Sequence, residues 1–500
     1  MDENERRLER LEEAVPAASA TAGPRSGQDE WVARSAERRG GRGGRWGVLE
    51  ARLRVVPWWA WLILFVAVVA ALPLFFESGY VRRVAFDTVI FMLLAHGLNV
   101  TVGWGGLLDL GYVAFFGVGA YTYAILSADR YDLHLPIFVT IPAAAVIGGI
   151  VGLLVGLPSR RLSGDYLAIV TLFFFQIFLT VSNNSDSIFG HNVAGGPNGI
   201  LNVRPLSLFG HELPVSHEGI FNVSYLYVAL AVFVVVFIAL RFVNESRTGR
   251  AWRSLREDSL AAELMGMPVN WLKLMAFAFG AATAALTGTL VTALNGSVFP
   301  QTFEFPLLIT VYTMVILGGA GSQAGVVIGA IGISVLLEVL REPGDSHFLF
   351  YAIVLLGLIG TLRFSRQLAF VLGGTLVLGF ALHALAAAID GNWTAGVANG
   401  GGRLGAWANN WVVVPGDLAS WVTPVSYMGL VAAVLALTVL RGWARLVLLV
   451  PTLYLGAFVW ENVMLARPEP TRFVVLGALL IAAMIARPEG LLGEKRVEIV

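Results

Sequence analysis

Ionisable side chains inside the long apolar stretches of this chain are few, and they limit the chemistry that it can perform. Asp109, Glu304 and Glu338 lie within or beside apolar segments. A charged group is costly inside a bilayer, so each carboxylate is a candidate ion or proton site. No matching set of Arg and His residues accompanies them to form a proton relay. An ion-coupled carrier is therefore one hypothesis, and these three carboxylates would be its site.

Motifs typical of enzymes are absent from the sequence. "GGAGSQAG" (318–325) lacks the lysine of a phosphate-binding loop, and there is no HExxH or GxSxG. His96 and His383 fall within apolar stretches and are interpreted as packing residues. The chain has no cysteine, which excludes disulfides and thiolate chemistry. We expect no enzyme activity, no nucleotide site, no cofactor and no metal.

The charged stretch "GRAWRSLREDSLAAELMG" (249–266) interrupts the apolar segments and predicts a short helix. Ser259 is a good N-cap, "LAAEL" favours helix, and Gly266 would end it. We expect about two helical turns after an arginine-rich lead-in. Leu260, Ala261 and Leu264 would offer contact to a partner, and Ala262 would allow a close approach. From the residues alone, a solvated interfacial loop that satisfies the positive-inside rule is the favoured interpretation.

The elements that carry these residues are membrane-spanning helices. Apolar residues make up 57% of the 500 residues and charged residues 14%, against roughly 25% charged in an average soluble domain. The fold class is therefore all-α, a polytopic integral membrane protein with some glycine-broken segments. About fourteen candidate spans start near residues 57, 85, 108, 135, 166, 222, 271, 306, 324, 347, 367, 424, 443 and 471.

The distribution of Lys and Arg predicts the orientation. Residues 1–50 are polar, with no apolar stretch for a signal peptide, and we expect a disordered cytoplasmic tail. Loops that would face the cytoplasm carry most of the Lys and Arg, which indicates that both termini are cytoplasmic. "ESGYVRR" (77–83), Arg467 and Arg472 fall on the wrong side. The net charge of zero argues against a nucleic-acid partner.

Two glycine-rich segments are candidates for broken helices near a permeation path. They are "TVGWGGLLDLGYVAFFGVGAY" (101–121) and "VILGGAGSQAGVVIGA" (315–330). Ordinary small-residue packing faces are an equal alternative. The candidate pore or gating residues are Gly103, Gly105, Asp109, Tyr112, Gly318 and Gly319. The turn-rich loop 183–221 would lie outside, where it could dock a partner or close a pore.

Several blocks of the sequence resemble the branched-chain amino acid permease family of ATP-binding-cassette (ABC) importers, of the LivM type. "LAAELMG" is similar to the xAAxxxG core of the family's coupling loop, although Leu260 stands where the wider motif has Glu. The resemblance covers roughly residues 57–363 and the last 30, and its other blocks are "GLNVTVGWGGLLDLGYVAFFGVGAYTYAIL" (97–126), "YLAIVTLFFFQI" with "GGPNGI" (166–177 and 195–200), "MVILGGAGSQAGVVIGA" (314–330) and "RPEGLLGE" (487–494).

The resemblance implies half of a translocation path in the cell (inner or plasma) membrane. Its implied partners are two cytoplasmic ABC ATPases, a second homologous permease, an extracytoplasmic solute-binding protein and the lipid bilayer. Substrates would be leucine, isoleucine and valine, whereas some relatives carry urea, short amides or other amino acids. The implied ATPase-coupling helix comprises Ser259, Leu260, Ala261, Ala262, Glu263, Leu264 and Gly266, and the implied docking site for the binding protein comprises Gly195, Gly196, Pro197 and Asn198.

The chain departs from the family pattern in two places. Many members have Ser-Leu-Gly-His where this chain has Asp109-Leu110-Gly111-Tyr112, so substrate choice would differ if that segment touches solute. Residues 364–470 form an extra insertion of unknown role with three further spans. The predicted organisation is therefore a tail (1–50), a core permease domain (57–363), the insertion (364–470), and a final helix with a cytoplasmic tail (471–500).

Overall fold

A computed structural model provides the structure of the chain. The predicted tail (1–50) and the last residues, 494–500, lie outside the described residues. The chain divides into two units, Met1–Val69 and Ala70–Val500. The structure describes residues 57–76, 78–129, 133, 135–159, 162, 164–187, 192–208, 211–213, 216–217, 220–221, 223–341, 343–362, 365–397, 402–487 and 489–493.

The described residues form an all-α fold, as the sequence predicts. The α-helices are α4 (Trp58–Phe75), α5 (Gly79–Leu98), α6 (Tyr112–Ser127), α7 (Ile137–Ser159), α8 (Asp165–Asn183), α9 (Val223–Glu245), α10 (Arg247–Glu257), α11 (Ser259–Leu264), α12 (Val269–Asn295), α13 (Phe305–Gly318), α14 (Gln323–Val339), α15 (Pro343–Leu362), α16 (Arg366–Ile389), α17 (Gly402–Trp411), α18 (Val422–Val439), α19 (Trp443–Val459) and α20 (Pro468–Ala486). Each of the predicted span starts lies close to the first residue of one of these helices.

Short elements join the helices. They are the π-helical turns η1 (Asn99–Trp104) and η5 (Trp460–Met464), the 3-10 turns η2 (Gly196–Asn198), η3 (Pro300–Phe303) and η4 (Gly391–Thr394), and the strands β1 (Ser207–Leu208), β2 (His211–Glu212), β3 (Ser216–His217) and β4 (Ile220–Phe221). The strands pair antiparallel as two small ribbons, with Ser207 opposite Glu212 and Ser216 opposite Phe221.

Eleven helical segments of the described residues are long and apolar enough to cross a membrane. Three shorter apolar helices accompany them, at Tyr112–Ser127, Gln323–Val339 and Ser346–Leu362. The fold class of a polytopic membrane protein is therefore confirmed. The count of fourteen spans stays a prediction, because the three shorter helices have only 16 or 17 residues, at or below the shortest length of about 17 residues that a simple crossing needs.

Helix α12 forms the centre of the core and packs against α5, α6 and α7. Small residues make these contacts close: a Cβ atom at Gly119 would overlap the Ala285 carbonyl, and one at Gly288 would overlap the backbone of α6 at Phe116. Helices in a bilayer are not driven together by the hydrophobic effect, because lipid tails are as apolar as their side chains. Close van der Waals packing of this kind stabilises their association instead. The small-residue alternative is therefore correct for the glycines of α6, although not for the segment that precedes it.

Helices α5 and α13 end in the two breaks that the glycine pattern predicts. Helix α5 continues into η1, and no helix follows until α6 begins at Tyr112. Helix α13 ends at Gly318, and α14 begins at Gln323. The breaks meet: the Gly321 N–H donates to Asn99 Oδ1 (2.7 Å), and Trp104 Nε1 donates to the Gly321 carbonyl (2.9 Å).

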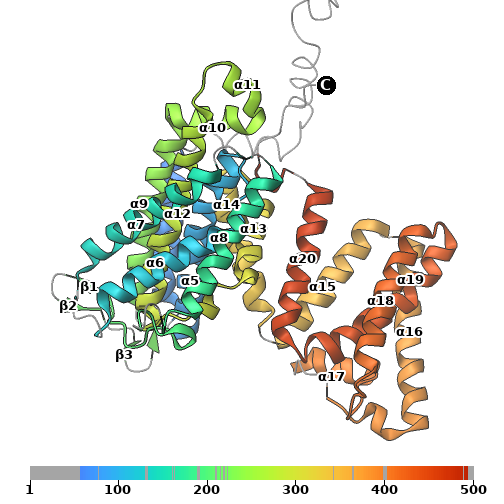
Figure 1. Cartoon of the computed structure of the whole chain (residues 1–500). Helices are drawn as coiled ribbons and strands as arrows, with labels where there is room; N and C mark the ends of the chain where they lie inside the picture. The colour runs from blue at the N-terminus through green and yellow to red at the C-terminus, as the bar shows by residue number, and fades with distance from the viewer. Residues whose placement is uncertain are drawn as a thin grey trace, which may run out of the picture. The chain divides into compact units, whose positions relative to one another are not determined.

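The core has two ends that carry different elements. Helices α10 and α11 lie at one end, and the β-ribbons lie at the opposite end (Figure 1). Helix α12 runs between them, since it follows α11 and is itself followed by η3. We call the first the α11 end and the second the far end.

Helices α15–α20 include the segment that the sequence identifies as an insertion. Helix α19 packs against α16 and α18, and α20 packs against α13. Two apolar clusters hold these helices together, one around Trp411 and Tyr454 and one around Val371 and Leu446. The assignment of 364–470 as a separate insertion stays a prediction.

Candidate functional site

Helix α11 occupies the position predicted for the short charged-segment helix, but its N-cap differs from the prediction. The side chain of Asp258 accepts hydrogen bonds from the backbone N–H groups of Leu260 (2.9 Å) and Ala261 (3.0 Å). The prediction of Ser259 as the cap is wrong. The carboxylate of Asp258, one residue earlier, accepts from two backbone N–H groups of the first turn that have no partner within the helix. The arginine-rich lead-in is also helical, as α10, which is capped by Ser246.

Helix α11 exposes most of its side chains, including several apolar ones. Leu260 is 65% exposed, Leu264 79% and Met265 82%, while Ala261, Glu263 and Gly266 are also exposed. Ala262 is buried and turns toward the chain's own body. These exposed positions form a small apolar tip between charged neighbours at the α11 end, which is a suitable surface for another protein.

Helix α10 connects α11 to the broken segments of the core. The buried Trp252 stacks on Trp104 of η1, and its Nε1 donates to the Leu272 carbonyl of α12 (2.8 Å). The guanidinium of Arg256 donates to the carbonyls of Gly103 (2.6 Å) and Ala320 (3.3 Å). One side chain therefore joins the α10–α11 unit to both breaks.

The candidate pore glycines lie at this junction. Gly103 accepts the Arg256 bond, and a side chain there would overlap Asn99 and Gly321. Gly105 lies at the end of η1 and is buried. Gly318 packs against Gly325 of α14. The structure thus brings these glycines together, but inside a packed contact region.

The "RPEGLLG" block packs onto the second break. The N–H groups of Leu491 and Leu492 donate to the carbonyls of Leu317 (2.9 Å) and Gly318 (3.0 Å). Gly319 has a φ of 111°, which side chains rarely adopt, and a Cβ atom there would overlap the backbone of Gly493. Glycine is therefore required at this position both for its conformation and for the close approach.

Asp109 and Tyr112 are fully buried between the first break and the core. Asp109 Oδ1 accepts from the Gly111 N–H (3.0 Å), and its Oδ2 has no hydrogen-bond partner among the described residues. Tyr312 of α13 donates to the Asp109 carbonyl (2.8 Å) and accepts from its N–H (3.0 Å). The Tyr112 hydroxyl donates to the Leu94 carbonyl (2.7 Å). The hydroxyls of Tyr112 and Tyr312 thus fasten the start of α6 to α5 and α13.

At the far end, the predicted docking loop folds into η2. Gly195 and Gly196 are buried, and the N–H of Gly196 donates to Ser185 Oγ (3.0 Å) at the end of α8. Pro197 and Asn198 are exposed. The loop is therefore held by its glycines and presents only its last two residues to a partner.

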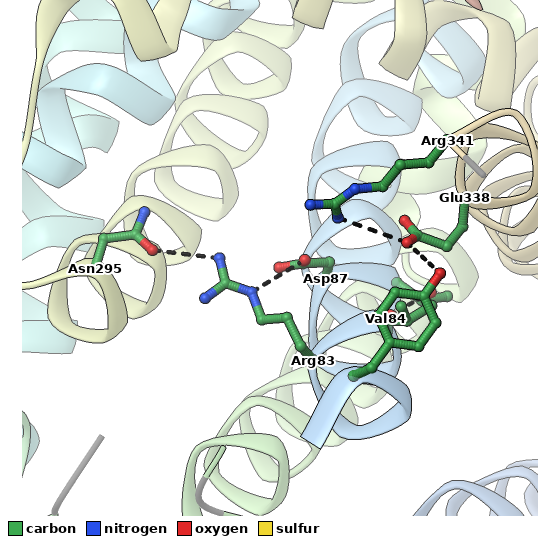
Figure 2. Close-up of polar contacts among 8 residues, drawn as sticks. Arg83, Val84, Asp87, Asn295, Glu338 and Arg341 are labelled. Atoms are coloured by element: carbon green, nitrogen blue, oxygen red, sulfur yellow. Dashed lines mark hydrogen bonds and ion pairs between the residues drawn. The ribbon is translucent and has the colours of Figure 1, made fainter. Parts of the chain in front are cut away.

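Among the residues that the structure describes, the three carboxylates of the ion-coupling hypothesis do not form a group. Glu338 accepts from the Tyr80 hydroxyl and lies 3.6 Å from Arg341, while Asp87 pairs with Arg83 at 3.1 Å (Figure 2). Arg83 also donates to Asn295 Oδ1 (3.3 Å) at the end of α12. This polar network joins the far ends of α5, α12 and α14. Arg83 lies on the side where the distribution of Lys and Arg predicts few positive charges, and its charge is neutralised by Asp87.

The two histidines within apolar stretches pack in the described core. His96 is buried against Phe233 and Phe237, with Nδ1 2.8 Å from the Met92 carbonyl. His383 Nδ1 lies 3.2 Å from the Val412 carbonyl. Their interpretation as packing residues is confirmed.

Sequence reasoning missed the side chains that connect the elements. Arg256 and Trp252 were visible only as part of a charged stretch, and nothing local indicates that they contact segments about 150 residues earlier in the chain. Asp258 could have been found, because Asp is as good an N-cap as Ser.

The fold and the junction define a polytopic membrane protein in which the short exposed helix α11 is joined, through Arg256 of α10, to glycine-broken spans. A family model described as "Branched-chain amino acid transport system / permease component" matches residues 80–362. The chain belongs to this family. No solved structure matches the chain.

Three relatives illustrate the similarity. The high-affinity branched-chain amino acid transport system permease protein LivM of Salmonella typhimurium is 36% identical over 314 residues, covering 59% of this chain and 70% of the relative. The permease protein LivH of Escherichia coli is 26% identical, over 48% of this chain and 78% of the relative. The fructose import permease protein FruG of Bifidobacterium longum is 24% identical, over 59% and 84%.

Proposed function

We propose that this chain is the membrane-spanning permease subunit of an ABC importer for branched-chain amino acids. The relatives named LivM and LivH support the substrate class, because the chain matches most of their length. The permease would form half of the path, paired with a second homologous permease. Both of its termini would be cytoplasmic in the cell membrane, with the α11 end inside and the far end outside.

The observation that carries the proposal is the exposed tip of α11 and its connection through Arg256 to both breaks. An apolar tip in water is unfavourable unless a partner covers it, and Leu264 and Met265 are among the most exposed apolar residues described. A cytoplasmic ATPase that receives this tip could move α10, and Arg256 would carry the movement to Gly103 and Ala320. The pore and gating roles of these glycines are part of the proposal.

In the same scheme, a solute-binding protein would dock at the far end. Pro197 and Asn198 are the exposed residues of the candidate docking loop. The loop is anchored on both sides by hydrogen bonds, so a protein that binds there would press on α8 and η3.

The test is reconstitution in proteoliposomes with the co-purifying ATPase, second permease and binding protein. We expect ATP-dependent uptake of leucine, isoleucine and valine, and loss of the ATPase when Leu264 and Met265 are both changed to Asp. Leu201→Asp is the control, because Leu201 is also exposed but lies at the far end. A chain that keeps its ATPase after the double change, or that moves leucine in an ion gradient without any ATPase, contradicts the proposal.

A second candidate differs only in the solute. FruG is named for fructose import and matches a similar share of this chain, so an importer for another small solute is the alternative. Uptake of fructose, urea or another amino acid instead of leucine by the same reconstituted complex would favour it.

A further inference from the structure

One face of α8 carries a polar side chain, Gln176, where a lipid-facing helix would be apolar throughout. Gln176 is exposed, and it stands ten residues after Tyr166, the first residue of the candidate span Tyr166–Asn183. At 1.5 Å per residue it lies about 15 Å along a span of about 27 Å, close to the middle of the bilayer. Its amide has no hydrogen bond to the described residues, and leaving it in lipid would cost roughly 2–7 kcal/mol. This face therefore meets water or protein rather than lipid.

The same face lines an open groove between α8 and the start of α13. Its volume is about 600 Å³, within the range of about 300–1,000 Å³ of small-molecule sites. The wall is apolar, with Leu172, Phe173 and Leu179 among its residues, and Gln176 is its amide. A carboxylate, Glu304, completes the lining, and the groove contains no Lys or Arg.

Glu304 is an unusual residue at this place. Its carboxylate makes no hydrogen bond or ion pair with any residue that the structure describes, and it is exposed. An uncompensated carboxylate beside apolar side chains attracts a cation. The lining thus combines one anionic group, one amide that can donate to a carboxylate, and an apolar wall. These are the complements of an ammonium, a carboxylate and an aliphatic side chain.

The candidate docking loop lies directly against the segment that leads to Glu304. Ile200 and Val298 exchange two backbone hydrogen bonds of 3.0 Å, and Gln301 Nε2 donates to the Pro197 carbonyl (3.3 Å). A Cβ atom at Gly199 would overlap the Val298 carbonyl, so the two segments are in close contact. Glu304 follows η3 in this segment and therefore stands at the far-end side of the groove.

We propose that the α8–α13 groove is this chain's half of the solute path, and that Glu304 receives the ammonium group of an apolar α-amino acid at its mouth. The inference rests on the proposed function and adds the residues that meet the substrate. Gln176 donates to the substrate carboxylate, and the wall of Leu172, Phe173 and Leu179 contacts its side chain. The second permease closes the open side of the groove.

The first experiment tests whether water reaches the groove. The chain has no cysteine, so each single-cysteine variant carries one thiol. Gln176→Cys should react with a charged, membrane-impermeant methanethiosulfonate at least tenfold faster than Ile177→Cys. Ile177 is the matched control, because it is the next residue of α8 and 59% exposed but does not line the groove. Equal rates for the two variants, whether fast or slow, would overturn the proposal.

The second experiment uses the reconstituted importer and measures leucine taken up per ATP hydrolysed. Glu304→Gln should lower this ratio at least tenfold while the ATPase rate and subunit composition stay unchanged, and Glu304→Asp should recover part of it. Glu212→Gln, an exposed carboxylate at the far end that lies 3.7 Å from Arg204, should behave as wild type. Wild-type uptake by Glu304→Gln would overturn this inference alone, whereas no ATP-dependent leucine uptake by the wild-type complex would overturn the proposed function.

Discussion

Arg256 is the residue on which the connection between the α11 end and the core depends. It is half-buried, and it reaches two carbonyls that belong to segments far apart in the sequence, Gly103 and Ala320. Hydrogen bonds from a charged donor contribute about 1.5–3 kcal/mol each. Arg253, one turn earlier in the same helix, donates instead to Asn244 close by.

This contrast gives the prediction at the residue scale. Arg256→Met should keep the helix and the ATPase, because Met is a good helix former, but leucine moved per ATP should fall about tenfold, the equivalent of about 1.4 kcal/mol of lost coupling. Arg253→Met is the control and should stay within twofold of wild type. The measurement is the ratio of uptake to hydrolysis in proteoliposomes. A normal ratio for Arg256→Met would mean that movement reaches the breaks by another route.

At the scale of elements, α11 is a short helix whose stability depends on its cap. It has only six residues, so helix propensity alone cannot hold it together in water. The Asp258 carboxylate and the packing of Ala262 are what keep it formed, while its apolar residues point outward. A coupling element needs this combination of a fixed backbone and free side chains.

The cap is tested by hydrogen exchange. Asp258→Ala should cost about 1 kcal/mol of local stability, so the amides of residues 260–262 should exchange about fivefold faster. Ser259→Ala should leave their exchange unchanged, because the Ser259 side chain is exposed and does not cap the helix. Faster exchange in the Ser259 variant alone would show that the cap is the one that the sequence suggested.

At the scale of the whole molecule, a buried polar contact joins helix α15, inside the family match, to η5, which lies beyond it. His347 of α15 and Glu461 of η5 are both fully buried, with Nδ1 and Oε1 2.9 Å apart. The Tyr351 hydroxyl donates to the same carboxylate oxygen (2.9 Å). Helix α15 lies within the family match, which ends at residue 362, and η5 lies beyond it.

Breaking this contact should loosen the helices that follow the family match. Leaving a buried polar group without its partner costs about 1–3 kcal/mol, so Glu461→Ala should lower the thermal unfolding midpoint clearly. Tyr351→Phe removes a single hydrogen bond of about 1 kcal/mol and should lower the midpoint less. The exposed Glu469→Ala should change little. Tryptophan fluorescence during heating of the detergent-solubilised chain measures the shift. An unchanged midpoint for Glu461→Ala would show that the contact does not hold these helices.

Much of this architecture was predictable from the sequence, because it depends on local patterns. Apolar runs of spanning length follow from the cost of exposing the backbone to lipid, and they located the long apolar helices between α4 and α20, although not α17. The glycine clusters predicted the breaks before Tyr112 and after Gly318, and the charged stretch predicted α11. These features are set by residues close in the chain, so a single sequence carries them.

Other features were decided only by the tertiary structure. The contact of Arg256 with Gly103, the packing of Gly493 on Gly319, and the pairing of Arg83 with Asn295 join segments that are separated by 150 residues or more. No local pattern encodes such a meeting, because it depends on how every helix between them packs. The sequence by itself determined which segments cross or break in the membrane, and the three-dimensional packing decided which of them act on one another.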